Sequence, residues 1–202
     1  MLTPVVKAFL TDRGFTACVD AQQVFGGHGY IREWGMEQYV RDVRIAQIYE
    51  GTNGVQAQDL TGRKVVRNRG IFVQRYVEEV RALLASMKNE PELDVFTRPL
   101  ARALERLQEG TDALLQQAVH DPDASGAAAV DYLHLFGLTV YAHMWALMAK
   151  TAQPHRSENA FYADKLRLGA YFMERMLPEV DQRLAAVRAG AALMMDFSEA
   201  YF

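Results

Sequence analysis

Cysteine is almost missing from this chain of 202 residues, since Cys18 is its single example. No disulfide can therefore form within the chain, and the disulfide framework of a small secreted protein is excluded. A lone cysteine is typical of a reducing compartment, so we expect a cytoplasmic protein in which Cys18 is a small buried side chain. The five histidines are scattered, and their spacing predicts no metal site.

An excess of positive charge and a long apolar run are also missing. Lys and Arg total 22 against 25 Asp and Glu, which gives a net charge of -3. This balance argues against a surface for nucleic acid or anionic lipid. Apolar stretches such as residues 135–140 are far too short to cross a bilayer, and residues 1–12 show no signal-peptide pattern.

Signals for β-strands are nearly absent as well. Alternating runs of β-branched residues are rare, and Asn53-Gly54 lies between helical segments instead of alternating apolar runs. Apolar residues recur at helical spacing through almost the whole chain. We therefore predict an all-α fold, with helices over residues 3–25, 36–43, from 52 onward, 71–88, 93–119, 124–152 and 158–189.

The ends of these helices are marked by local signals. Thr3 before Pro4 is typical of an N-cap followed by proline at the first helical position. Short proline-containing breaks near residues 89–91, 120–123 and 153–155 separate the long helices, which predicts an antiparallel bundle. Pro178 predicts a kink in the last helix. We expect two domains, over residues 1–68 and 69–202.

Residues 20–64 differ from the rest of the chain. Gly26, Gly27 and Gly29 lie between two helical stretches, where glycine permits positive φ and a close approach of the backbone to another group. Exposed amides at such a turn are able to hold a phosphate. A simple glycine-rich break between helices is the commoner explanation of such a pattern, and the pattern alone leaves both interpretations open.

Glu50 lies where a helix gives way to a loop, after the largely apolar segment 43–49. A carboxylate that is partly removed from water is a stronger base, so this position favours proton abstraction. A solvated glutamate at a helix end is the alternative. We expect Arg41, Asp42 and Arg44 to form an ion-pair cluster that fixes this loop.

Three pieces of residues 20–64 together resemble the C-terminal signature of the acyl-CoA dehydrogenase family. They occur in the order and at the spacing of that family, and the resemblance covers about residues 3–68. The pieces are Gln23-Val24-Phe25-Gly26-Gly27-His28-Gly29-Tyr30, Arg41-Asp42-Val43-Arg44-Ile45 and Ile48-Tyr49-Glu50-Gly51-Thr52-Asn53-Gly54-Val55-Gln56.

The resemblance implies an oxidoreductase that converts an acyl-CoA to a trans-2-enoyl-CoA. Glu50 would remove the α-proton, its backbone N–H would bind the thioester oxygen, and Gly51 would lie against the substrate. FAD would take the hydride and pass electrons on, usually to electron-transfer flavoprotein. The residues implied at FAD are Gln23, Gly26 and Gly27 for a neighbouring subunit, and Thr52, Asn53 and Gly54 within the same subunit; the enzyme would thus be a homo-oligomer.

The remainder of the chain resembles the extra helical domain of longer bacterial members, through residues 131–137 and Met144-Trp145. Relative to a complete member, the N-terminal helical domain and the β-domain are missing. We therefore expect a fragment that is inactive alone, does not hold FAD firmly, and self-associates through an exposed face at Leu2, Val5, Val6 and Phe9. A non-catalytic helical interaction module of the same descent is the alternative function.

Overall fold

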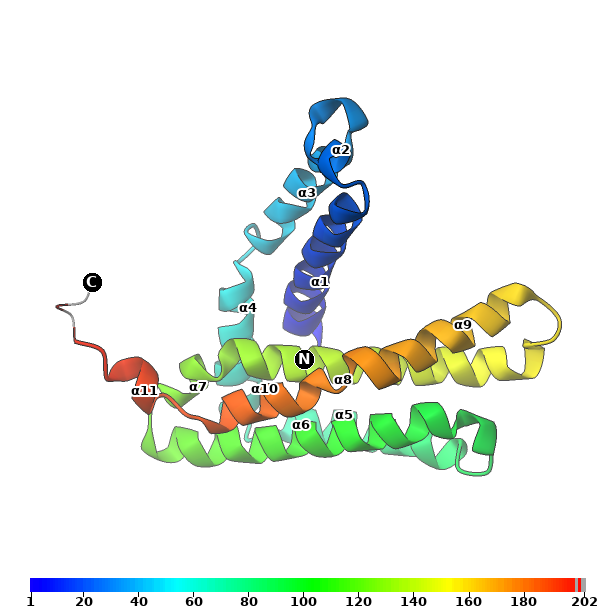
Figure 1. Ribbon diagram of the computed structural model, residues 1–202. Helices are drawn as coiled ribbons and strands as arrows, with labels where there is room; N and C mark the ends of the chain where they lie inside the picture. Colours follow the sequence, from blue (N-terminus) through cyan, green and yellow to red (C-terminus); the bar gives the residue numbers. More distant parts are fainter. Residues whose placement is uncertain (199, 201–202) are drawn as a thin grey trace.

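The computed structural model describes residues 1–198 and residue 200. These residues are largely helical and contain no β-strand, which confirms the all-α prediction. Figure 1 shows two parts, an upright helical hairpin and a bundle of longer helices that lies across its foot. Among the described residues, no helix is both long enough and apolar enough to cross a membrane.

The hairpin has two antiparallel arms, α1 (Thr3–Val24) and α3 (Met36–Arg44). Its upper end is closed by α2 (Gly27–Tyr30) and a 3-10 turn at Arg32–Trp34. After α3, a 3-10 turn at Ile45–Gln47 and a loop lead down to α4 (Asn53–Gln58). The chain then continues as a π-helix over Asp59–Val66 and enters the bundle.

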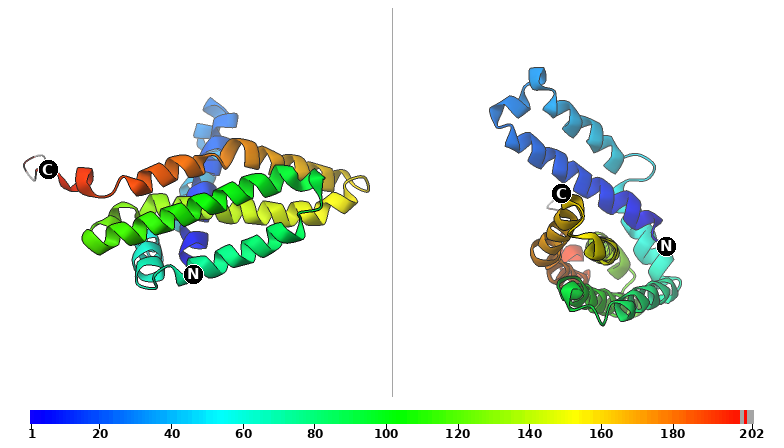
Figure 2. Two further views of the ribbon diagram at one scale, coloured as in Figure 1. Left: turned by 90° about the horizontal axis from the view of Figure 1, so that it is seen from below. Right: turned by 90° about the vertical axis from the view of Figure 1, so that its right-hand side faces the viewer.

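The bundle consists of α5 (Ile71–Ser86), α6 (Asp94–His120), α8 (Ala129–Ala152) and the segment from α9 (Ala160–Tyr171) to α10 (Glu179–Arg188). These helices run in alternating directions (Figures 1 and 2), which confirms the predicted antiparallel bundle. The short α7 (Ala124–Ala127) and α11 (Ala192–Met195) lie at one end. Because α8 contacts α1, α4, α6, α9 and α10, it is the central helix.

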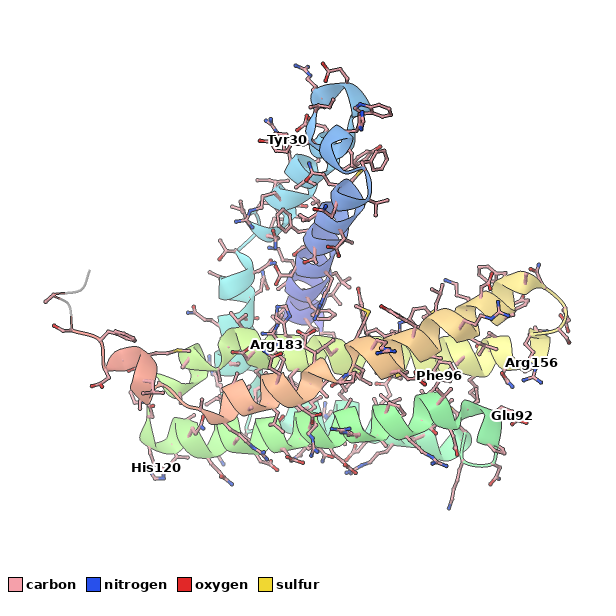
Figure 3. The ribbon with its side chains drawn as sticks, viewed as in Figure 1. Tyr30, Glu92, Phe96, His120, Arg156 and Arg183 are labelled. Carbon is pink, nitrogen blue, oxygen red and sulfur yellow. The ribbon has the colours of Figure 1, made fainter. Side chains whose placement is uncertain are left out.

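The core follows from the spacing of apolar residues along these helices. In α6 the buried side chains recur every three or four positions, so that they form one face. Figure 3 labels Phe96, which is buried where α9 passes over α6 and lies against Gly169. The hydroxyl groups of Thr111 and Tyr132 are 2.7 Å apart within the core, so each has a hydrogen-bond partner.

Two predicted helices are divided in the structure. The helix expected over 124–152 breaks at Ala128, between α7 and α8. The helix expected over 158–189 passes through a π-helical segment at Phe172–Met176 before Pro178. Proline has no N–H to donate, so the hydrogen-bond ladder cannot continue through it. The N–H of Leu177 donates to the Phe172 carbonyl at 2.9 Å, and the α-helix is interrupted just before Pro178, where the sequence predicts a kink.

Two local predictions are wrong. Leu2, not Thr3, is the N-cap of α1, and no side chain caps this end, because Thr3 already lies inside the helix beside Pro4. Cys18 is half-buried instead of buried, because the upper part of α1 packs against the short hairpin elements and not against the bundle.

The foot of α1 is buried against α8, contrary to the exposed face expected from the sequence. Val5 and Phe9 are 2% and 1% exposed, Leu2 is half-buried, and Val6 alone of the four is exposed. The Phe9 ring lies edge-on to Tyr141, with ring centroids 4.9 Å apart. A Cβ at Gly137 would approach Phe9 ring atoms to 2.3 Å, so α8 accommodates the ring through glycine. The bundle therefore supplies the partner surface for this end of the hairpin.

Ion pairs join the same helices at the edge of this contact. Arg13 of α1 lies 2.6 Å from Glu179 of α10, and Arg183 lies 2.8 Å from both Glu179 and Asp131 of α8. Figure 3 labels Arg183 beside the foot of α1. Burial alone would raise the pKa of Glu179, but hydrogen bonds from Arg13 and Arg183 outweigh burial and hold this pKa below its ordinary value of 4.5.

We predict that Gly137→Ala destabilises the chain, because the new methyl group overlaps the Phe9 ring. Overpacking of this kind lowers the free energy of unfolding by about 1–3 kcal/mol, measurable by urea denaturation. Gly126→Ala is the control, since a Cβ at Gly126 meets nothing within 4 Å. Equal midpoints and slopes for Gly137→Ala and wild type would refute the close contact.

A second prediction concerns pH. The folded-state pKa of Glu179 is lowered, so its stabilising contribution is present above about pH 4.5 and is lost as the pH falls further. The difference in unfolding free energy between wild type and Glu179→Gln should therefore be largest at neutral pH and shrink in acid. Asp164→Asn, in an exposed ion pair with Arg167, is the control and should show little difference. A Glu179→Gln difference that stays constant down to pH 3 would contradict this interpretation.

Candidate functional site

The glycine turn occupies the upper end of the hairpin. Gly26 has φ 59°, a left-handed conformation that L side chains rarely adopt. A Cβ at Gly29 would lie 2.4 Å from the Gln22 carbonyl oxygen, and the Gln22 amide donates to the Gly29 carbonyl at 3.1 Å. At Gly26 and Gly27 a Cβ would meet nothing within 4 Å, so their backbone faces open space. The turn thus has a fixed shape and an accessible backbone.

Large apolar side chains surround this turn and are exposed. Val24 is 86% exposed and Tyr30 is 81% exposed, and Figure 3 shows Tyr30 at the end of the hairpin farthest from the bundle. Trp34 is 56% exposed, and its indole ring contacts the His28 ring edge-on, with centroids 4.7 Å apart. Clustered apolar exposure is typical of a surface that another protein covers.

The Glu50 turn, residues 48–52, lies at the other end of the hairpin, between α3 and α4. Glu50 has φ 52° and Gly51 has φ 82°, so two consecutive residues are left-handed. This conformation costs a non-glycine residue about 1–3 kcal/mol, and it persists only where neighbouring contacts enforce it. The Glu50 side chain is exposed, as are Ile48 and Tyr49. The partial removal from water expected for Glu50 is therefore absent in this chain.

Hydrogen bonds from α1 hold the Glu50 turn. The Lys7 ammonium group donates to the Gly51 carbonyl and to Asn53 Oδ1, each at 2.8 Å. The Gln56 amide donates to the Glu50 carbonyl at 3.1 Å. Thr52 is the N-cap of α4, and its hydroxyl accepts from the Val55 N–H at 3.4 Å. The backbone on both sides of Gly51 is thus fixed while the Glu50 carboxylate remains free to meet a ligand.

Asp12 connects this turn to the bundle. Its Oδ1 accepts from Asn53 Nδ2 at 2.6 Å and from Gln47 Nε2 at 2.7 Å, and its Oδ2 lies 3.1 Å from His134 Nε2 of α8. Burial pushes the pKa of Asp12 upward, but the hydrogen bonds with His134, Gln47 and Asn53 outweigh it, so this pKa is below its ordinary value. The carboxylate therefore stays ionised in the position where it binds all three side chains.

The residues predicted from the sequence form two groups. Gln23, Gly26 and Gly27 lie at the upper end of the hairpin, and Glu50, Gly51, Thr52 and Gly54 lie near its foot; all are exposed. Asn53 differs, because it is half-buried and its amide bonds to α1. Since α1 rises about 1.5 Å per residue, the sixteen residues from Lys7 to Gln23 separate the groups by about 24 Å. Their ligand-binding roles remain predictions.

The ion-pair cluster expected at Arg41, Asp42 and Arg44 is wrong. Asp42 instead accepts a hydrogen bond at 2.6 Å from Gln38, the residue one helical turn before it. Arg44 donates to Gln47 at 2.7 Å, and its guanidinium group lies 5.7 Å from the centroid of the Phe15 ring. Helical spacing explains the difference, because Asp42 is one residue from Arg41 and two from Arg44, and residues at these spacings on α3 do not face each other.

Sequence reasoning missed Lys7, Asp12 and His134. The spacing of Lys7 and Thr11, one helical turn apart, places both on the face of α1 that meets Asn53. No comparable signal exists for His134, which is 122 residues away from Asp12 in the sequence. The packing of α1 on α8 alone brings these two side chains together.

Comparisons with known proteins agree with this architecture. Residues 1–64 match the family model described as acyl-CoA dehydrogenase, C-terminal domain, and residues 76–198 match the model described as acetyl-CoA dehydrogenase C-terminal like. The chain is 34% identical to 3-methylmercaptopropionyl-CoA dehydrogenase of Ruegeria pomeroyi over 182 residues, 88% of this chain and 31% of that protein.

Two further relatives differ in how much of this chain they match. The broad-specificity linear acyl-CoA dehydrogenase FadE5 of Mycobacterium tuberculosis is 27% identical over 100% of this chain and 35% of its own length. The mitochondrial isobutyryl-CoA dehydrogenase of Bos taurus is 46% identical over 55 residues, 27% of this chain and 13% of that protein. The chain spans about a third of the length of the first two relatives. With both family models matched along the hairpin and the bundle, this chain belongs to the acyl-CoA dehydrogenase family.

Proposed function

We propose that this chain supplies the catalytic base of a flavin-dependent acyl-CoA dehydrogenase, and that Glu50 is this base. The observation that carries the proposal is the Glu50 turn itself. Its backbone is strained at Glu50 and Gly51 and is anchored by Lys7, yet the Glu50 carboxylate is exposed. A fixed backbone beneath an accessible carboxylate suits a side chain that must meet a substrate in one orientation.

In the proposed reaction, the Glu50 carboxylate accepts the α-proton of an acyl-CoA thioester. The thioester oxygen gains negative charge as this proton leaves, and the Glu50 backbone N–H donates a hydrogen bond to it. Gly51 leaves room for the substrate beside the carboxylate, because it has no side chain. Bound FAD would supply the acceptor for the hydride that leaves the β-carbon, and loss of the α-proton and the β-hydride gives a trans-2-enoyl-CoA.

The exposed residues of both groups fit edge contacts with FAD, and each group would meet a different copy of the cofactor. Gln23, Gly26 and Gly27 present open backbone at the end of the hairpin, where they would reach the cofactor of a neighbouring subunit in a homo-oligomer. Thr52 and Gly54 would contact the cofactor of their own subunit. Asn53 fits through its backbone alone, since its amide side chain already bonds to Asp12, Thr11 and Ala8.

The rest of the proposal concerns the setting of this reaction. Electron-transfer flavoprotein is the proposed electron acceptor, and the single cysteine supports a reducing compartment such as the cytoplasm. The chain alone is proposed to be inactive, because Glu50 and the glycine turn are open to water. The exposed apolar end of the hairpin also favours the alternative of a purely interacting helical module.

Mutation of Glu50 distinguishes the catalytic function from the alternative of a non-catalytic interaction module. In the complete polypeptide that joins this chain to flavin-binding domains, Glu50→Gln should slow anaerobic flavin bleaching by an acyl-CoA by about 10²–10⁴-fold. Glutamine keeps the size of the side chain but cannot accept the proton, whereas substrate binding should change far less. Glu33→Gln, at the other end of the hairpin, is the matched control. If Glu50→Gln bleaches its flavin at the wild-type rate, another residue is the base.

Another prediction of the proposed function concerns FAD binding by the 202-residue chain alone. We expect it to release FAD during gel filtration, because an exposed edge buries too little of the cofactor to hold it. Fluorescence titration should give no saturation at micromolar FAD. A yellow protein that elutes with stoichiometric flavin would show that these residues form a complete cofactor site.

A further inference from the structure

The hydrogen bonds beneath the Glu50 turn form one connected path from Gly51 to α8. The path runs from the Gly51 carbonyl through Lys7 and Asn53 to Asp12, and from Asp12 to His134. We propose that Lys7, Asp12 and His134 are positioning residues, through which the C-terminal bundle sets the orientation of Glu50. The inference rests on the proposed function, because it takes Glu50 as the base.

Lys7 acts on the residue that directly follows Glu50. The ammonium group of this half-buried residue donates to the Gly51 carbonyl and to Asn53 Oδ1 at 2.8 Å each. This contact fixes the direction of the peptide group between Gly51 and Thr52. Glu50 and Gly51 are both left-handed, so the turn would relax toward commoner conformations if the contact were lost. Relaxation would turn the Cα–Cβ bond of Glu50, and with it the carboxylate.

Asp12 acts on both ends of the turn at once. Gln47 lies three residues before Glu50 and Asn53 three residues after it, and both side chains donate to the same oxygen, Oδ1, at 2.7 and 2.6 Å. A single carboxylate on the rigid helix α1 therefore sets the separation between the entry and the exit of the turn. Hydrogen bonds to an ionised acceptor are stronger than neutral ones, which suits this role.

His134 acts on Asp12 from the bundle. Its side chain is 12% exposed, its Nε2 lies 3.1 Å from Asp12 Oδ2, and its ring packs edge-on against Phe9 with centroids 5.5 Å apart. Within the described residues its buried Nδ1 has no hydrogen-bond partner. The tautomer with the proton on Nε2 is therefore the neutral form that donates to Asp12. Because His134 lies in the segment that matches the second family model, the added bundle reaches the turn through this side chain.

Hydrogen exchange on the 202-residue chain tests the positioning without any activity. The amides of Ile48, Tyr49, Val55 and Gln56 are hydrogen-bonded at the edges of the Glu50 turn and report its opening. His134→Leu removes the donor to Asp12 and Lys7→Met removes the donor to Gly51. Each should raise exchange at these amides about tenfold while the core of α6 stays protected.

Two further variants complete this design. His134→Gln can still donate to Asp12 and should keep exchange within about threefold of wild type. His155→Leu removes a second histidine–carboxylate pair among the described residues, which is exposed on the bundle, and should leave the Glu50 turn unchanged. The inference is overturned if His134→Leu exchanges like wild type at the turn, or if the glutamine and leucine variants exchange alike.

Kinetics in the complete polypeptide test the consequence for the base. His134→Leu should lower kcat about tenfold with KM within about twofold of wild type, and His134→Gln should restore kcat. Glu50→Gln, measured in parallel, tests the proposed function alone. If Glu50→Gln is inactive while His134→Leu has the wild-type kcat, the positioning inference is wrong and the proposed function stands. If Glu50→Gln is fully active, the proposed function is wrong, whatever the exchange data show.

Discussion

The seating of Phe9 on Gly137 is the contact on which the rest of this structure depends. The lower end of the hairpin is apolar, and leaving it exposed to water would cost free energy. Helix α8 provides the surface that buries Val5 and Phe9. Glycine at position 137 lets the ring reach the backbone of α8, and the close packing leaves no space for a methyl group. The position of α1 against the bundle is fixed by this contact, and α1 in turn carries Lys7 and Asp12.

Apolar and polar contacts contribute differently where α1 meets the bundle. The apolar contact supplies the stabilisation, since burying aromatic surface is the larger favourable term. The polar groups at its edge, Arg13 with Glu179 and Asp12 with His134, fix the orientation of α1. Both carboxylates accept several hydrogen bonds, which outweighs the cost of their partial burial and holds their pKa values low. One helix thus joins the stable bundle to a strained turn.

The two ends of the hairpin differ in how far their apolar side chains are exposed to solvent. The foot is covered by the bundle, whereas the far end leaves Val24, Tyr30 and Trp34 exposed beside the glycine turn. The glycine turn keeps its shape without a partner, because Gly29 packs tightly against Gln22 and Phe25. A preformed turn surrounded by apolar side chains suits a surface that meets another subunit, and this agrees with the proposed homo-oligomer.

Helical periodicity in the sequence was sufficient to determine the all-α class and the approximate course of the long helices, and Pro178 marked the break before α10, because these features depend on neighbours along the chain. The signature around Glu50 likewise identified the family, since its residues are contiguous. Only the tertiary structure decided that Val5 and Phe9 are buried, that Arg44 lies over Phe15 instead of pairing with Asp42, and that the Asn53 side chain faces Asp12. The link from Asp12 to His134 spans 122 positions, and no local pattern encodes it. It exists because α1 crosses α8 at Gly137, one turn from His134, and that crossing is set by the packing of the whole bundle.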